Sequence, residues 1–202
     1  ADTPELRAAH AENLPRVTEF YTRQGSDERL YAKYKALAAS LAAATLSAPR
    51  KQALNHWLRD FKLGGADLQG ESKARYAEIQ DRLAELSQAF SNHVLDATDA
   101  FAHYASADEM DGVPADVVQA ARSAAEAEGK AGHKITLHFP SYFPVLQYGS
   151  HRPLRELLYR AYATRASELG NAALDNSAVM QELLTLRQEE ARLLGFANYA
   201  EE

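Results

Sequence analysis

The sequence predicts a mainly α-helical protein: an antiparallel helical bundle with one long helix and one small β-hairpin. Over most of the 202 residues, apolar side chains recur at helical rather than two-residue spacing. Capping residues and prolines stand where successive helices would begin, and glycines stand where they would end. One apolar seam repeats every seven residues through about 71–104. A helix of that length needs partners along its sides, which favours a bundle.

The first three helices are predicted from their ends. Thr3 followed by Pro4 is typical of an N-cap with proline at the first helical position, so a helix should run from there to about residue 21. A second, alanine-rich helix is expected over about 26–46. A third should begin at Pro49 and end at Gly64 and Gly65, because glycine can adopt the left-handed conformation that closes a helix.

The long helix is expected over about 71–104. Its seam comprises Tyr76, Ile79, Leu83, Leu86, Phe90, His93, Ala97 and Tyr104. A shorter helix should follow over about 114–129. Residues 134–148 alternate and are rich in aromatic and β-branched side chains, with proline and glycine as punctuation, so a β-hairpin is predicted there. Two last helices are expected over about 151–166 and 177–194.

These elements predict one helical segment over 1–202. A helical bundle would occupy 1–130, a small β element 134–149, and a pair of helices 151–202.

The composition excludes several classes of protein. There is no cysteine, which rules out a disulfide framework and thiolate catalysis. The formal charge of −6 and the lack of a basic block argue against nucleic-acid partners. No apolar run approaches the roughly 20 residues of a membrane span. We therefore expect no nucleic-acid or membrane partner, and a cytoplasmic location.

The usual catalytic motifs are missing. None of the seven histidines is followed by glutamate or preceded three residues earlier by one, so neither HExxH nor ExxH occurs. GxSxG, GxGxxG and the phosphate-binding loop are absent as well. His93 is either a buried ligand or a core-edge histidine bonded to a neighbouring helix, and the second interpretation is favoured. Glu189 and Glu190 are expected on a solvated face. The chain alone should thus have no catalytic or metal-binding residue, bind no cofactor and be inactive.

One helix has an unusual composition, with four arginines between residues 151 and 165. A functional interpretation is that this helix anchors carboxylates of a substrate or of another domain through bidentate pairs. The alternative is a solvated face held by ion pairs of Glu156 with Arg152 and Arg160. The candidate contact residues are Arg155, Tyr159, Tyr162 and Arg165.

Five blocks of sequence strongly resemble the oligopeptidase A branch of the thimet oligopeptidase family, and they occur in the family's order. The blocks are WLRDFKLGG (57–65), RLAELSQAFSN (82–92), HFPSYFPVL (138–146), RELLYRAYATRAS (155–167) and LLGFANYA (193–200). The resemblance covers nearly the whole chain, although no block is a catalytic motif.

The resemblance implies a helical N-terminal segment of a zinc metallopeptidase that cleaves short peptides in a channel between helical lobes. The family's HExxH helix and glutamate ligand lie downstream of the last block. Zinc is therefore implied for the parent protein, and the parent's catalytic lobe and short peptides are the implied partners. In this interpretation the chain supplies part of the channel wall. The alternatives are a stand-alone helical binding or scaffold module and, less favoured, an independent enzyme with an unrecognised site.

Overall fold

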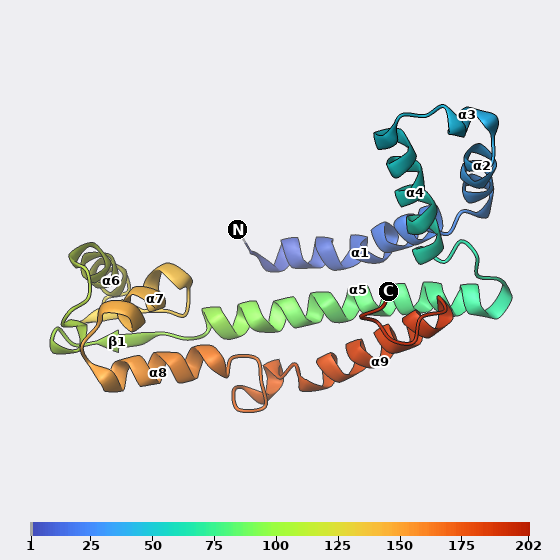
Figure 1. Cartoon of the computed structure of the whole chain (residues 1–202). Coiled ribbons are helices and arrows are strands. Elements are labelled where there is room, and N and C mark those ends of the chain that lie inside the picture. Colours follow the sequence, from blue (N-terminus) through green and yellow to red (C-terminus); the bar gives the residue numbers. More distant parts are fainter. Residues whose placement is uncertain (1) are drawn as a thin grey trace. The chain divides into compact units, whose positions relative to one another are not determined.

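The computed structural model describes residues 2–202, and its mainly helical fold confirms the predicted class (Figure 1). In chain order the elements are α1 (Pro4–Gly25), α2 (Glu28–Ala38), α3 (Leu41–Ala44), α4 (Ala48–Leu63), α5 (Gly70–Asp99), β1 (His103–Ala105), η1 (Asp108–Met110), α6 (Ala115–Ala127), β2 (His133–Ile135), α7 (Phe139–Tyr148), α8 (Arg152–Ala163), η2 (Ala172–Leu174) and α9 (Ser177–Leu193). The chain divides into two compact units. Unit 1 comprises the residues up to Gln88 together with Gln181–Glu202, and unit 2 comprises Ala89–Met180.

The helices of unit 1 begin and end largely as their caps predict. The Thr3 hydroxyl accepts a hydrogen bond from the Leu6 amide at 3.2 Å, and Pro4 opens α1. The expected helix over 26–46 is divided into α2 and α3, because Ser40 caps a new short helix there. Gly65 closes α4 with a φ of 80°, as its position in the sequence indicates.

An aromatic cluster joins α2 to α4 in unit 1. The ring centroids of Tyr31 and Tyr34 lie 5.6 Å and 5.3 Å from that of Phe61. At the end of α4 a Cβ on Gly64 would come within 2.7 Å of the Gly25 carbonyl oxygen, so only glycine permits this approach. Gly25 and Gly64 therefore allow the ends of α1 and α4 to approach closely where the aromatic cluster ends.

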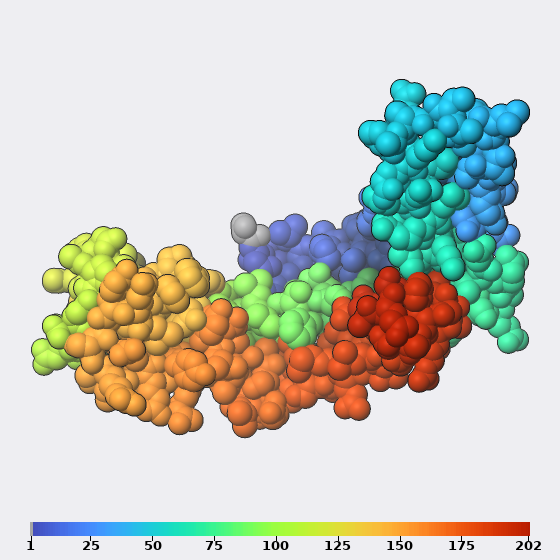
Figure 2. Space-filling view, in the orientation of Figure 1, coloured from blue at the N-terminus to red at the C-terminus, as the bar shows by residue number. Residues whose placement is uncertain are grey.

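Two bidentate ion pairs bind the first half of α5 to α9 within unit 1. Arg75 Nε lies 2.7 Å from Glu189 Oε1, and Arg82 Nε lies 2.6 Å from Glu182 Oε1. From the first ion pair to the second, the residue number rises in α5, from Arg75 to Arg82, and falls in α9, from Glu189 to Glu182. The two helices are therefore antiparallel, as expected for a bundle. The C-terminal residues, drawn in red in Figure 2, lie against α9, where Gln188 Nε2 donates to the Ala197 carbonyl at 3.0 Å.

The long helix is five residues shorter at its end than the seam predicts. Tyr76, Ile79 and Leu86 are buried, which confirms the first half of the seam. The helix ends at Asp99, however, and Tyr104 lies in β1 rather than in α5. Tertiary pairing explains the difference, because His103–Ala105 forms a ladder with a strand some thirty residues later.

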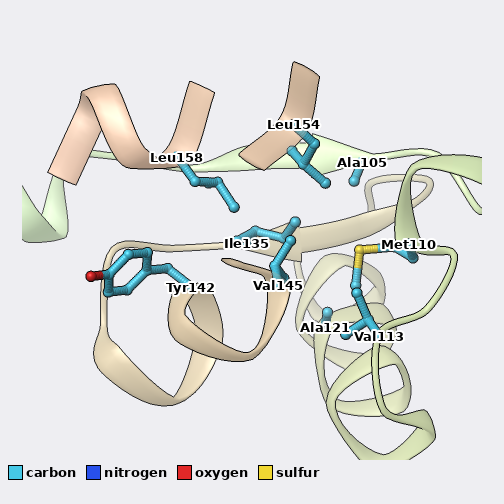
Figure 3. Packing of buried hydrophobic residues seen from close by; sticks show 9 residues of the cluster. All are labelled: Ala105, Met110, Val113, Ala121, Ile135, Tyr142, Val145, Leu154 and Leu158. Carbon is cyan, nitrogen blue, oxygen red and sulfur yellow. The ribbon is translucent and has the colours of Figure 1, made fainter. Parts of the chain in front are cut away.

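Unit 2 is built on that small antiparallel sheet. Tyr104 in β1 is paired with Lys134 in β2. Leu154 and Leu158 point from α8 toward Ile135 of β2 and Val145 of α7, and together these side chains form the centre of the core (Figure 3). All four are at most 1% exposed.

The predicted hairpin at 134–148 is correct in kind but wrong in extent. Only its first residues are a strand, which pairs with β1, while Phe139–Tyr148 forms the helix α7. The buried residues of this segment, Tyr142 and Val145, are three positions apart, which is a helical spacing. Pro140 stands at the start of α7, where no amide donor is needed. Helical packing therefore prevails over the strand preference of its aromatic residues.

Candidate functional site

The arginine-rich helix α8 has a rigidly packed inner face. His151 caps its N-terminus, because its Nδ1 accepts a hydrogen bond from the Leu154 amide at 3.3 Å. Leu154 and Leu158, one turn apart, then enter the core of unit 2. The backbone of α8 is thereby fixed, and its remaining side chains project from a defined position.

The outer side of α8 borders a surface hollow in unit 2, which we call the arginine hollow. It is lined by Leu146 from α7 and by Arg152, Arg155, Glu156 and Tyr159 from α8. Tyr159 is 63% exposed. Glu156 accepts a hydrogen bond from Arg160 at 3.0 Å. The expected pair of Glu156 with Arg160 is therefore present, and the expected pair with Arg152 is not formed.

The Arg152 and Arg155 guanidiniums form no ion pair with Glu156, the acidic residue that lines the same hollow. Within residues 2–202, neither the Arg152 nor the Arg155 side chain makes a hydrogen bond or an ion pair. Both side chains are exposed and leave their donors to solvent. Since a guanidinium offers five donors in a planar fork, such a group can bind a carboxylate bidentately.

The other two candidate residues belong to a stack at the C-terminal end of α8, where Tyr162 lies in the last turn and Arg165 lies just beyond the helix. The ring of Tyr162 lies parallel to that of Tyr142 from α7, with centroids 4.2 Å apart and planes inclined by 14°. The Arg165 guanidinium carbon lies 3.6 Å from the Tyr162 centroid, and Arg165 Nη1 donates to the Tyr162 carbonyl at 2.7 Å. Burial, with the nearby Tyr162, raises the pKa of the Tyr142 hydroxyl.

This stack joins the end of α8 to α7, so its residues have a clear structural use. Arg165 Nε is buried and has no hydrogen-bond partner among the residues that the structure describes. The cation–π contact with Tyr162 compensates part of that loss. The four candidates are thus divided: Arg155 and Tyr159 line the arginine hollow, while Tyr162 and Arg165 hold α8 in place.

His93 adopts the structural role that its position favours. Its Nδ1 lies 2.8 Å from Oδ1 of Asn176, and Asn176 Nδ2 donates to the Phe90 carbonyl at 3.2 Å. Asn176 is 1% exposed, and this network satisfies both polar groups of its buried side chain. The histidine therefore anchors the start of α9 within unit 2.

Glu190 in unit 1 is a buried carboxylate, whereas the sequence places it on a solvated face. It is 7% exposed, and its Oε1 accepts a hydrogen bond from Gln80 at 2.6 Å. Burial raises the pKa of Glu190 above its usual value, and the Gln80 bond opposes that rise. Its partner in sequence, Glu189, instead forms the ion pair with Arg75, which lowers its pKa.

The spacing of the buried residues along α9 could have revealed Glu190. Leu183, Leu186 and Glu190 recur at the three- and four-residue intervals of one helix face. A glutamate on such a face is expected to be enclosed when the helix packs.

No metal centre can be built from residues 2–202. No group of three or more His, Cys, Asp or Glu side chains in that range lies in a position to hold a metal ion.

No helix within residues 2–202 has the length and apolar character required to cross a bilayer.

Comparisons with known proteins place both ends of the chain in one group of peptidases. Residues 1–73 match the family model described as Neurolysin/Thimet oligopeptidase, N-terminal domain. Residues 145–202 match the model described as Peptidase family M3.

Individual relatives are similar along the whole chain. The sequence is 45% identical over 204 residues to oligopeptidase A of Salmonella typhimurium, covering 100% of this chain and 30% of the relative. It is 47% identical over 203 residues to oligopeptidase A of Haemophilus influenzae, covering 99% of this chain and 30% of the relative. A probable cytosolic oligopeptidase A of Arabidopsis thaliana is 37% identical over 208 residues, covering 99% of this chain and 29% of the relative. The chain thus spans about 30% of the length of these relatives.

Proposed function

Because this chain belongs to peptidase family M3, we propose that it is part of a larger zinc-dependent oligopeptidase that hydrolyses short peptides. The observation that carries the proposal is the alignment of the entire chain with 30% of an oligopeptidase A. Similarity at this level along the full length favours a shared role for this segment as well as a shared ancestor.

Within the larger protein, we propose that the segment forms part of the helical wall of the substrate channel and contributes no catalytic residue. Its sequence has no HExxH motif. The side chains of residues 2–202 do not fit a zinc site, because no three potential ligands come together. Zinc in such peptidases activates a water molecule and polarises the scissile carbonyl. In this proposal the ligands and the general base belong to residues outside these 202.

Exposed apolar side chains support a role within a larger protein. Helix α1 has no buried residue, although it carries Leu6, Val17, Phe20 and Tyr21, each at least half exposed. A surface of this kind is typical of an area that another part of a protein covers. A stand-alone binding or scaffold module would be expected to bury these residues or to replace them with polar ones.

The test is to sequence the reading frame beyond the codon for Glu202 and to express its full product. We expect an HExxH helix with a downstream glutamate, and zinc-dependent hydrolysis of short peptides that the 202-residue chain does not perform. A stop codon directly after Glu202 would refute the proposal and favour the stand-alone module. The proposed compartment is the cytoplasm, and recovery of the tagged protein from the culture medium would contradict it.

A further inference from the structure

The arginine hollow combines three properties that the proposed wall function does not require. It is concave, it contains two arginines without partners, and it is bordered by an exposed aromatic ring. A purely structural face of α8 would be expected to pair its charges, as Arg160 does with Glu156.

Arg152 and Arg155 form no ion pair within residues 2–202, although acidic residues outnumber basic ones in the chain. The chain carries 28 acidic and 22 basic residues. Elsewhere in unit 2, Arg122 lies 2.9 Å from Glu126, and Lys134 forms an ion pair with Glu128. Arg152 and Arg155 therefore retain a local positive charge on a protein that is negative overall, which would attract an anion to this hollow.

The positions of the hollow's side chains match a carboxylate with an adjoining apolar group. Arg152, Arg155 and Tyr159 are separated by three and four residues, so they share one face of α8. The two arginines lie in the first turns of a twelve-residue helix, where the backbone dipole also favours an anion. Leu146 and the ring of Tyr159 supply apolar surface beside them.

The hollow is pre-organised by the core behind it. Leu154 and Leu158, on the inner face of α8, are 1% and 0% exposed, and they fix the backbone that carries the arginines. Little backbone ordering would accompany binding, which favours affinity. Only the arginine and tyrosine side chains would become restricted.

We propose that the arginine hollow binds the carboxylate of a short acidic peptide. The Arg152 and Arg155 guanidiniums donate to the carboxylate oxygens, and an apolar neighbour of the acidic residue packs on Leu146 and Tyr159. A small concave site suits a peptide side chain better than the broad, flat surface typical of contacts between domains. The proposal extends the proposed function, which assigns peptides to the larger protein as substrates, and it adds a site for them on this segment.

The experiment measures binding of two labelled peptides to the 202-residue chain by fluorescence anisotropy at low ionic strength. Both peptides are acetylated and amidated pentapeptides that differ only by glutamate or glutamine at the centre. We expect the glutamate peptide to bind about tenfold more tightly, as a charge-assisted pair predicts. Arg155→Ala should abolish most of this preference, whereas Arg122→Ala, which removes an equal charge from α6, should leave it unchanged.

Charge reversal makes the test independent of any loss of folding. Arg155→Glu should convert the preference to a peptide with lysine at the centre, while circular dichroism shows the same helix content. The proposal is overturned if the wild-type chain binds the glutamate and glutamine peptides equally. Equal effects of Arg155→Ala and Arg122→Ala would also overturn it, since net charge alone would then explain binding.

The same measurement on the product of the full reading frame identifies the occupant. Retained discrimination supports a site for free peptides. Its loss in the longer protein would show that the remainder of the chain covers the hollow, which contradicts the proposal. A reading frame without HExxH would refute the proposed peptidase and would leave the binding result on the 202-residue chain unaffected, so the two failures are distinguishable.

Discussion

Truncation of Leu158 to alanine should strongly destabilise unit 2. The Leu158 side chain is 0% exposed and lies in the cluster formed by α7, α8 and β2 (Figure 3). The change removes three carbon atoms, which corresponds to roughly 2.4 kcal/mol of lost transfer free energy at about 0.8 kcal/mol each. The residual cavity adds to this loss, so we expect a total cost of ~3–5 kcal/mol.

Leu157 provides a matched control one residue away. It is the same residue type on the same helix, but it is 41% exposed. Water can fill the space left by Leu157→Ala, so no cavity forms, and the expected cost is about 1 kcal/mol. The two variants should therefore differ by ~2–4 kcal/mol.

Urea titration followed by far-ultraviolet circular dichroism measures this difference. With a slope of about 2 kcal/mol per molar urea, the midpoint of Leu158→Ala should lie roughly 1–2 M below that of Leu157→Ala. Midpoints are compared because a chain with two units need not unfold in a single step. Equal midpoints for the two variants would refute the packing of α8 and, with it, the fixed backbone on which the arginine hollow depends.

Three further outcomes are expected. Burial raises the pKa of Glu190, so the folded state keeps this proton to higher pH than the unfolded chain, and stability falls as pH rises through the folded pKa. Glu190→Gln removes this loss, so the variant should melt above the wild type at about pH 7 and close to it at about pH 4; a constant difference would contradict the buried carboxylate. Gly129→Ala should cost roughly 1 kcal/mol, because its φ of 68° disfavours alanine in open space. Gly112→Ala should cost clearly more in the same denaturation assay, because its Cβ would lie 2.6 Å from the Tyr148 oxygen, and equal costs would contradict this turn. Micromolar zinc should leave the melting temperature unchanged, since a native-state site at 100-fold saturation would add about 2.7 kcal/mol, and a rise of several degrees would reveal such a site.

The helix boundaries of unit 1 could be predicted because they are encoded locally. Thr3 and Pro4 open α1, and Gly65 takes the positive φ that ends α4. Each of these signals acts within one turn and needs no knowledge of the rest of the fold. The helical spacing of Ile79 and Leu86 similarly predicts which face of α5 is buried.

The β element was only partly predictable, because its pairing is not local. The strand at His133–Ile135 falls near the expected position, but its partner, His103–Ala105, continues a heptad pattern that favours helix. The segment Phe139–Tyr148 contains residues that prefer strands, and its helical form depends on burying Tyr142 and Val145 against α8 and α6. Intrinsic preference and tertiary packing disagree in both segments, and packing prevails.

The sequence could locate the candidate site, but it could not show that the candidate residues form two separate groups. The density of arginine and tyrosine singles out α8, whereas the separation of Arg155 and Tyr159 from Tyr162 and Arg165 follows from the stacking of Tyr142 on Tyr162. That contact brings together two helices, and no spacing within either helix reports it.

The single tryptophan of the sequence makes the two units spectroscopically distinct. Trp57 lies on α4 in unit 1, half exposed, with its ring centroid 5.8 Å from that of Tyr34. Unit 2 has aromatic residues but only tyrosine and phenylalanine among them. Fluorescence excited at the red edge of the absorption band comes from tryptophan alone. Its emission therefore reports the surroundings of α2 and α4 only, without any label. Any substitution or ligand confined to unit 2 that shifts this emission would provide a direct optical measure of communication between the units.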